Sequence, residues 1–199
     1  MIKEKWDSQF SQHPFTYGKK VNNFIKEKSG IFPANSSIAC FAEGEGRNAI
    51  YLAKLGHSVT TYDISPIGLQ NTTILAKENG VSVKTKESDL TKMKTQTGKY
   101  DGAIMVFGHV EHRDQEFFIK NIINSVSSEG YVMLEVYSKQ QLNYDTGGPG
   151  KEPFLYNPAD MLQWIAPYTC IHFYYGEVTR EEGYRHTGIG HVIQVIIRK

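Results

Sequence analysis

Residues 38–48 read IACFAEGEGRN and residues 58–69 read SVTTYDISPIGL, and these two stretches decide the fold. The first opens with an apolar run that is too short for a helix and leads directly into Gly44 and Gly46. Residues 48–55 then place apolar side chains at helical spacing. The pattern predicts a strand, a tight glycine turn and a helix, and such a turn lets the backbone approach a bound molecule closely.

Short apolar runs and longer helical patterns alternate along the rest of the chain. Ser65 and Pro66 are typical of a helix start, because serine caps the first turn and proline fits its first position. This alternation is typical of a parallel sheet that helices cover on both faces. The predicted strands span residues 38–42, 58–62, 82–87, 101–107, 131–137, 169–178 and 189–197, and the predicted helices span 48–55, 66–79, 114–127 and 158–166.

The last third of the chain has a different pattern. The connection between the last two predicted strands contains Gly183 and Gly188, which favours a hairpin over a helical crossover. The final strand is therefore expected to be antiparallel. We predict one α/β domain over residues 1–199, with a doubly wound, mostly parallel sheet, and a helical cap over the site from residues 1–35.

The composition disfavours several classes of protein. The chain has 199 residues, 40% hydrophobic and 22% charged, which is ordinary for a soluble domain. A net charge of +1 gives no broad electrostatic footprint for nucleic acid or an anionic membrane. The N-terminus lacks a secretory signal and no apolar run could span a bilayer, so a cytoplasmic location is expected. Cys40 and Cys170 lie in predicted strands and are expected to be buried and unpaired.

Acidic residues end the second and third predicted strands. Asp63 follows the second strand, where a carboxylate accepts hydrogen bonds from both ribose hydroxyls of an adenosine. Asp89 is placed to bind the exocyclic amine of adenine, with the Leu90 backbone N–H on a ring nitrogen. A helix-capping role for Asp63 and a solvated loop position for Asp89 are the alternatives. With the glycine turn, these residues predict a nucleoside site at the carboxyl edge of the sheet.

Residues 38–48 and 59–69 resemble the first two signature regions of class I S-adenosylmethionine-dependent methyltransferases. The likeness is closest to a small bacterial subgroup similar to the tellurite-resistance methyltransferase. It extends over nearly the whole chain through the segments HPFTYGK, FGHVEH, YDTGGP and EGYRHTG. The common third glycine of the loop is replaced by Arg47-Asn48, as in that subgroup. The resemblance implies a Rossmann-like, seven-stranded sheet, S-adenosylmethionine as cofactor, and methyl transfer to a small-molecule acceptor.

The resemblance also implies which residues form the site. The expected cofactor-binding residues are Tyr17, Ala42, Glu43, Gly44, Gly46, Arg47, Asn48, Asp63, Ile64, Ser65, Asp89, Leu90, Phe107 and Gly108. The expected acceptor-side residues are Tyr144, Glu182 and His186, with Gly147 and Gly148 belonging either to the pocket or to a simple turn.

Two histidines follow the fourth predicted strand. His109 and His112 are spaced so that one helical face could carry both, which allows a proton relay or a metal pair. A backbone hydrogen bond for His109 and an exposed helix start for His112 are the alternatives. We assign His109 as the candidate catalytic residue and assign no metal site.

Two other functions fit the same glycine turn. Gly44, Gly46 and Ala49 also satisfy the dinucleotide pattern of an NAD(P)-dependent oxidoreductase. Against this, Glu45 would repel a pyrophosphate, and too few residues remain for a separate substrate domain. A non-catalytic protein that senses the nucleoside is the other alternative. The methyl donor carries a sulfonium and an ammonium instead of phosphates, which favours the methyltransferase.

Overall fold

A computed structural model describes residues 2–183 and 186–199, and it forms a seven-stranded sheet in the order β3-β2-β1-β4-β5-β7-β6. Neighbouring strands from β3 to β5 pair in parallel, and β7 pairs antiparallel with both β5 and β6. The predicted fold, with an antiparallel last strand, is confirmed. The strands are β1 Ser37–Phe41, β2 Ser58–Asp63, β3 Lys84–Glu87, β4 Tyr100–Val106, β5 Val126–Tyr137, β6 Thr169–Gly183 and β7 His186–Arg198.

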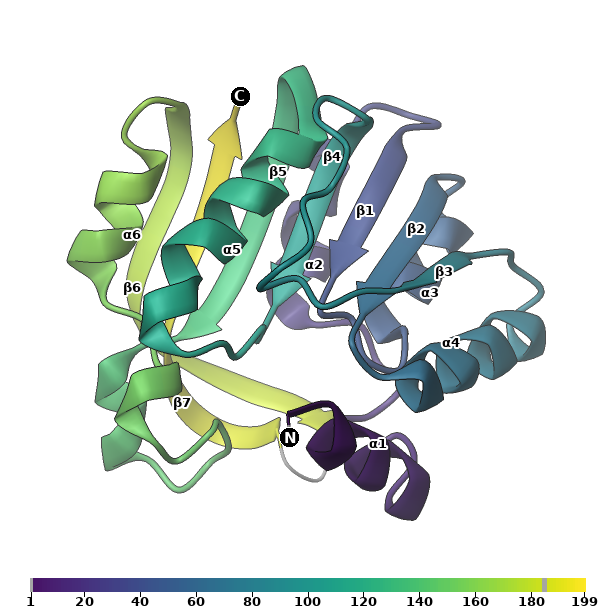
Figure 1. The fold of residues 1–199 in the computed structure, drawn as a ribbon, viewed down its shortest axis with the longest axis horizontal. Helices are drawn as coiled ribbons and strands as arrows, with labels where there is room; N and C mark the ends of the chain where they lie inside the picture. The colour runs from purple at the N-terminus through teal and green to yellow at the C-terminus, as the bar shows by residue number, and fades with distance from the viewer. Residues whose placement is uncertain (1, 184–185) are drawn as a thin grey trace.

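Helices cover both faces of the sheet (Figure 1). Helices α5 and α6 pack on one face through a core that includes Phe118 and Trp164, while α2 and α3 pack on the other through Phe24 and Leu52. Successive strand residues alternate between the two cores, as the pleat of a strand requires. The helices are α1 Ile2–Gln12, α2 Asn23–Lys28, α3 Arg47–Lys54, α4 Pro66–Glu78, α5 His112–Ser125 and α6 Pro158–Ile165, with short 3-10 turns at Ser29–Ile31, Lys139–Asn143 and Glu152–Phe154.

Local sequence signals account for several helix ends. The Ser65 hydroxyl accepts from the Gly68 N–H, so Ser65 caps α4 and Pro66 occupies its first turn, as predicted. Asn157 caps α6 in the same way through the Ala159 N–H. These caps satisfy N–H groups that a helix leaves without an internal partner.

The last two strands are longer than predicted. Residues 179–183 and 186–188, expected to form a loop, continue β6 and β7 as a two-stranded arm. The inward residues Arg180 and Glu182 are polar although both are buried, so the alternating apolar pattern of a strand is missing there. The prediction that Cys170 is buried is wrong, because it lies exposed on edge strand β6, whereas Cys40 is buried as expected.

The N-terminal helix α1 lies at the carboxyl edge of the sheet. The arrowheads of β1 and β2 lie at the edge of the sheet nearest α1, and the β6–β7 arm curls beneath the sheet toward the same helix (Figure 1). Within the described residues, no helix is both long and apolar enough to cross a bilayer.

Candidate functional site

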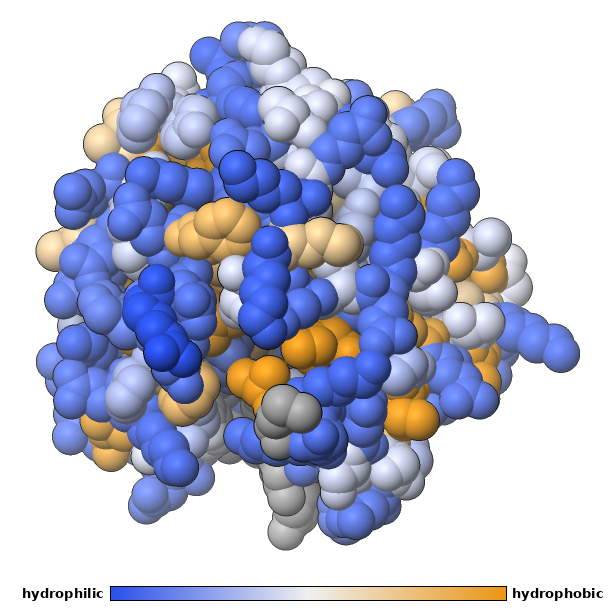
Figure 2. All heavy atoms as spheres, viewed as in Figure 1, coloured by the Kyte–Doolittle hydropathy of each residue, from blue (hydrophilic) through white to orange (hydrophobic). Residues whose placement is uncertain are grey.

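A cavity of about 580 Å³ opens at the carboxyl ends of the parallel strands. Its walls come from α1, the glycine turn after β1, the ends of β2, β3 and β4, and the loop after β5. On this face of the molecule, apolar side chains gather above α1 within a mostly hydrophilic surface (Figure 2). The cavity therefore lies where open parallel α/β sheets bind their ligands.

The glycine turn has the backbone geometry that the sequence predicted. Gly44 and Gly46 have φ angles of 62° and 86°, in the left-handed region that favours glycine. A Cβ on Gly46 would lie 2.5 Å from Thr72 Cγ2, so only glycine fits between the turn and α4. Ala42 has a φ of 48°, an uncommon value for a residue with a side chain. The turn thus combines close packing with local strain at a wall of the cavity.

Asp63 links this turn to the end of β2. Its Oδ2 accepts from the Gly44 N–H at 2.8 Å and its Oδ1 accepts from the Ser65 N–H at 2.9 Å. Burial raises the pKa of Asp63 to about 6, against the effect of these backbone hydrogen bonds. The carboxyl group also lines the cavity, where it can accept further hydrogen bonds from hydroxyl groups.

The carboxylate of Glu43 occupies the N-terminus of α3. Its Oε1 accepts from the Asn48 N–H at 2.8 Å and from the Ala49 N–H at 2.9 Å. Burial raises the pKa of Glu43 to about 7, while the hydrogen bonds and the Arg47 charge oppose the shift. Because a pyrophosphate would need these same helix N–H groups, the chain's own carboxylate competes with phosphate binding here.

Glu45 fixes the N-terminal segment to the turn. Its Oε1 accepts from the Phe15 N–H at 2.7 Å and from Asn71 Nδ2 at 2.8 Å. The second acidic residue of the loop therefore holds the segment after α1 against α4.

Asp89 and Leu90 line the cavity beside the end of β3. Burial alone would raise the pKa of Asp89, but hydrogen bonds from Lys92 and Thr91 lower it below its ordinary value. Lys92 Nζ lies 2.7 Å from the Asp89 carboxylate. Asp89 is thus ionised, and its carboxylate is already shared with a surface lysine.

Phe107, Gly108 and His109 form the wall after β4. Phe107 has a φ of 58° and its ring stacks on Tyr137 at 4.4 Å between centroids. His109 stacks on the same ring at 5.7 Å, and its buried Nδ1 has no hydrogen-bond partner among the described residues. Burial lowers the pKa of His109 to about 4, against a hydrogen bond with the Phe154 backbone, so its imidazole is neutral at pH 7.

His112 is not part of this wall. Its Nδ1 lies 3.4 Å from Gln115 Oε1 at the start of α5. Within the described ranges 2–183 and 186–199, no three His, Cys, Asp or Glu side chains are grouped to hold a metal ion.

The structure brings most of the predicted site residues to one cavity. Ser65, Tyr144 and Glu182 are not among the lining residues: Ser65 caps α4, the Tyr144 hydroxyl donates to Glu177 at 2.6 Å, and Glu182 lies in a buried polar network. The side chain of His186 lies outside the described residues. The predicted residues that line the cavity are Tyr17, Ala42, Glu43, Gly44, Gly46, Arg47, Asn48, Asp63, Ile64, Asp89, Leu90, Phe107, Gly108 and His109, together with Gly147 and Gly148.

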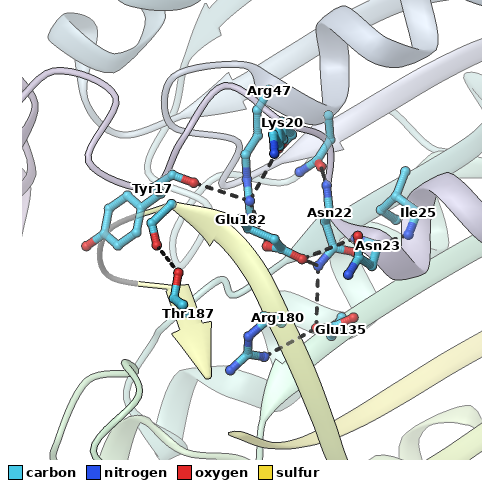
Figure 3. A network of polar contacts seen from close by, with 12 residues as sticks. Tyr17, Lys20, Asn22, Asn23, Ile25, Arg47, Glu135, Arg180, Glu182 and Thr187 are labelled. Atoms are coloured by element: carbon cyan, nitrogen blue, oxygen red, sulfur yellow. Dashed lines mark hydrogen bonds and ion pairs between the residues drawn. The ribbon is translucent and has the colours of Figure 1, made fainter. Parts of the chain in front are cut away.

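Glu182 anchors the network that Figure 3 shows. Its Oε2 accepts from Arg47 Nη1 at 2.7 Å, and its Oε1 accepts from Asn22 Nδ2 at 3.0 Å and from the Asn23 N–H at 3.1 Å. Asn22 also donates its N–H to Asn48 Oδ1 at 2.9 Å. The network therefore joins the β6–β7 arm, the N-terminal segment and the helix that follows the glycine turn.

Sequence reasoning did not find the remaining members of the network or the other lining side chains. Arg180 Nη1 lies 3.6 Å from Glu135 Oε1, and its guanidinium lies over the rings of Phe107 and Tyr137 at 5.0 and 4.6 Å. Nothing in the local pattern marks these residues, because tertiary folding alone brings them together. The further lining residues include Lys5, Trp6, Gln9, Phe10, Lys151 and Phe154.

Comparison with known proteins identifies methyltransferases as similar proteins. Residues 38–130 match the family model described as a methyltransferase domain. The ubiquinone biosynthesis O-methyltransferase of Rickettsia canadensis is 30% identical over 106 residues, which cover 52% of this chain and 44% of that protein. This chain thus spans less than half the length of that curated relative.

Solved structures share the fold at low sequence identity. TehB from Haemophilus influenzae has a TM-score of 0.74 at 18% identity, over 98% of this chain and 67% of that one. Magnesium protoporphyrin IX methyltransferase from Synechocystis, solved with bound SAH, has a TM-score of 0.72 at 16% identity, over 100% of this chain and 98% of that one.

Proposed function

We propose that this chain, whose residues 38–130 match the model of a methyltransferase domain, binds S-adenosylmethionine as its cofactor and methylates a small-molecule acceptor bound beside the sulfur. The single observation that carries the proposal is the site at the carboxyl edge, where the Gly44–Gly46 turn meets the buried carboxyl of Asp63. The neutral His109, whose Nδ1 has no partner among the described residues, lines the same cavity.

The residues of the cavity fit the methyl donor. Asp63 would accept from the ribose hydroxyls, and Asp89 with the Leu90 backbone would hold the adenine. The glycine turn would face the amino-acid tail beside the Phe10 ring, whose Cζ would lie 3.0 Å from a Cβ on Gly44. Carboxylates around this part of the cavity favour a ligand that carries a sulfonium and an ammonium.

The same residues disfavour a dinucleotide. Glu43 already accepts from the Asn48 and Ala49 N–H groups at the start of α3, where a pyrophosphate would bind in an oxidoreductase of this architecture. A second anion there would be repelled by Glu43, and the donors it needs are taken.

Methyl transfer mainly requires that the enzyme hold the reacting atoms in position. The bound cofactor supplies an electrophilic methyl group on a positively charged sulfur. A lone pair of the acceptor would form the new bond to that methyl carbon, the old carbon–sulfur pair would remain on sulfur, and an acceptor proton, where present, would be released. Holding the reacting atoms in line can contribute about 7–11 kcal/mol to such a step.

His109 has a specific place in this scheme. A neutral imidazole that lines the cavity can accept a proton from a protonated acceptor, an effect worth about 10²–10⁴ in rate. Its stacking on Tyr137 fixes the plane of the ring. An acceptor that is already an anion would not need this group.

Two measurements test the proposal. Titration calorimetry should show that S-adenosylhomocysteine binds the wild-type protein and that Asp63→Ala weakens this binding at least about tenfold, since hydrogen bonds to a charged group contribute roughly 1.5–3 kcal/mol. Incubation with isotope-labelled S-adenosylmethionine and a metabolite extract should then label a small molecule. Binding without any labelled product would instead indicate a nucleoside sensor, and preference for NAD(P) would refute the proposal.

A further inference from the structure

The cavity has two ends with different chemistry. Strand β1 separates the ends of β2 and β3, which carry Asp63 and Asp89, from the ends of β4 and β5. On the far side the wall is formed by His109 and by the loop that contains Lys151 and Phe154, while α1 adds Lys5 and Trp6. This second part of the cavity is where a methyl acceptor would lie, so its side chains bear on the nature of the acceptor.

Two lysines, Lys5 and Lys151, line this part of the cavity. Lys5 Nζ lies 5.5 Å above the Trp6 ring, and neither Lys5 nor Lys151 forms an ion pair within the described part of the chain. Glu111, an acidic residue of the cavity wall, pairs with Arg113 at 3.0 Å. The acceptor side is therefore positively charged, whereas the nucleoside side carries carboxylates.

His109 belongs to the same group of side chains. The charge of Lys5 contributes to lowering its pKa, and the Phe154 backbone hydrogen-bonds to it. The Phe154 N–H in turn donates to the Lys151 carbonyl at 3.2 Å, so Lys151 and Phe154 belong to one tight turn. The unpartnered His109 Nδ1 is fully buried against this turn, and buried polar atoms normally have a hydrogen-bond partner. The His109 residue also lines the cavity, so a ligand in this part of the cavity would lie beside its imidazole.

Aromatic rings complete the surroundings. Trp6 stacks on Phe10 at 5.6 Å and lies 6.4 Å from the Tyr17 ring, and Phe154 faces the cavity from the opposite segment. Flat apolar walls with two ammonium groups favour a planar ligand that carries an anion.

We propose that the acceptor is a small aromatic or heteroaromatic acid, with its carboxylate between Lys5 and Lys151 and its methyl-accepting hydroxyl facing the His109 imidazole. This inference rests on the proposed methyltransferase function. The hydroxyl oxygen forms a bond to the methyl carbon, the carbon–sulfur pair stays on sulfur as a neutral thioether, and the hydroxyl proton moves to His109 and then to water. Products are the aryl methyl ether and S-adenosylhomocysteine.

Binding to the protein saturated with S-adenosylhomocysteine tests the acceptor class without requiring turnover. Calorimetry with 4-hydroxybenzoate, 4-hydroxybenzamide and 4-hydroxybenzylamine compares an anion, a neutral amide and a cation on one ring. The acid should bind about tenfold more tightly than the amide, and the amine should bind weakest. Affinity for the acid alone should fall as salt rises, because exposed charges are screened.

Lysine variants connect this preference to the structure. Lys5→Gln and Lys151→Gln should each weaken acid binding about three- to fivefold, as expected for exposed ion pairs, and leave amide binding unchanged. Lys77→Gln, on an exposed lysine of α4 outside the cavity, is the matched control and should change neither. His109→Asn should keep acid binding and lower the rate of ether formation about 100-fold or more.

The outcomes separate the two proposals. Failure of S-adenosylhomocysteine to bind overturns the methyltransferase proposal itself. If S-adenosylhomocysteine binds normally, three results would overturn the acidic acceptor without affecting the methyltransferase proposal. The amide or amine could bind as tightly as the acid, or the acid could fail to bind at millimolar concentration. The third is acid binding that neither lysine variant changes.

Discussion

Replacing Glu182 by glutamine should be among the most damaging single changes outside the apolar core. The carboxylate accepts from Arg47 at 2.7 Å, from the Asn22 side chain at 3.0 Å and from the Asn23 N–H at 3.1 Å. The side chains of Glu182 and Arg47 are only 2% and 9% exposed. Water therefore cannot solvate the Arg47 charge that the substitution leaves without its carboxylate. Removing one member of a buried ion pair typically costs about 3–5 kcal/mol, a large part of the roughly 5–15 kcal/mol that stabilises an ordinary domain.

Urea unfolding followed by circular dichroism measures this cost. Arg47→Met should be similarly damaging, because it leaves Glu182 charged and buried, and the double variant should be more stable than the sum of the single losses predicts by about 2 kcal/mol. Glu116→Gln is the matched control: it breaks the exposed Lys120–Glu116 pair, with an N···O distance of 2.6 Å, and should cost about 0.5 kcal/mol or less.

Two results would refute this reasoning. One is a loss for Glu182→Gln no larger than that of Glu116→Gln. The other is strict additivity in the double variant, which would mean that the two side chains stabilise the fold independently of their contact. Hydrogen exchange adds a local readout, because the network holds the backbone of Asn22 and Asn23, whose exchange should accelerate in the Glu182 variant.

Four further predictions concern the site and the buried network beside it. Affinity for S-adenosylhomocysteine should fall as pH drops below about 6. Burial raises the pKa of Asp63 to about 6, and only its ionised form accepts from both ribose hydroxyls. Calorimetry from pH 5 to 8 should show this step in the wild-type protein and not in Asp63→Asn. The same raised pKa implies that Asp63 lowers the stability of the ligand-free protein as pH rises from its unfolded value near 3.8 to about 6, since the unfolded chain loses the proton first. Gly46→Ala should lower the free energy of unfolding by about 2 kcal/mol or more, measured by thermal unfolding, and weaken donor binding. The new Cβ would meet Thr72, and the backbone φ of 86° disfavours a side chain. Gly30→Ala, with open space around it, should change the stability by no more than about 0.5 kcal/mol. Arg180→Met combined with Glu135→Gln should leave the stability unchanged or raise it by up to about 2 kcal/mol. In the described part of the structure the buried Arg180 guanidinium makes no hydrogen bond that the change would remove. A loss of stability above about 3 kcal/mol would contradict this.

The parts of this structure that follow from local sequence were predictable. The strand–turn–helix at residues 38–48, the Ser65 cap and the acidic end of β2 each depend on residues that are close in sequence. Their geometry is fixed by glycine conformation and by hydrogen bonds that span a few residues. The order of strands then placed Asp63 and Asp89 at one edge.

The parts that depend on contacts between distant segments were not predictable in this way. The arm of β6 buries Arg180 and Glu182 instead of apolar residues. The alternation of apolar and polar residues that predicts a strand is therefore missing from its sequence. Lys5 and Lys151 look like ordinary surface lysines until α1 and the loop after β5 meet across the cavity. A pattern can indicate which residues face inward, but it does not give their partners.

The N-terminal segment is attached to the rest of the chain with unequal strength, and this has a dynamic consequence. Residues 15–23 are held by buried groups: Phe15 on Glu45, and Asn22 and Asn23 on Glu182. Backbone packing adds to this, because Gly18 and Gly183 lie so close that a Cβ on Gly18 would overlap the Glu182 carbonyl.

Helix α1, in contrast, is held mainly by the buried Phe10 ring and by polar contacts that include the exposed Lys3–Glu87 pair. Exposed pairs contribute at most about 1 kcal/mol, so the first turns of α1 should open far more often than residues 15–23. Hydrogen exchange of the ligand-free protein should therefore show fast exchange over residues 3–9 and protection from residue 22 onward, and bound S-adenosylhomocysteine should slow exchange in α1 because Trp6 and Phe10 line the cavity. Equal protection of both regions in the free protein would mean that α1 is a fixed wall, and a small acceptor would then have to enter by another route.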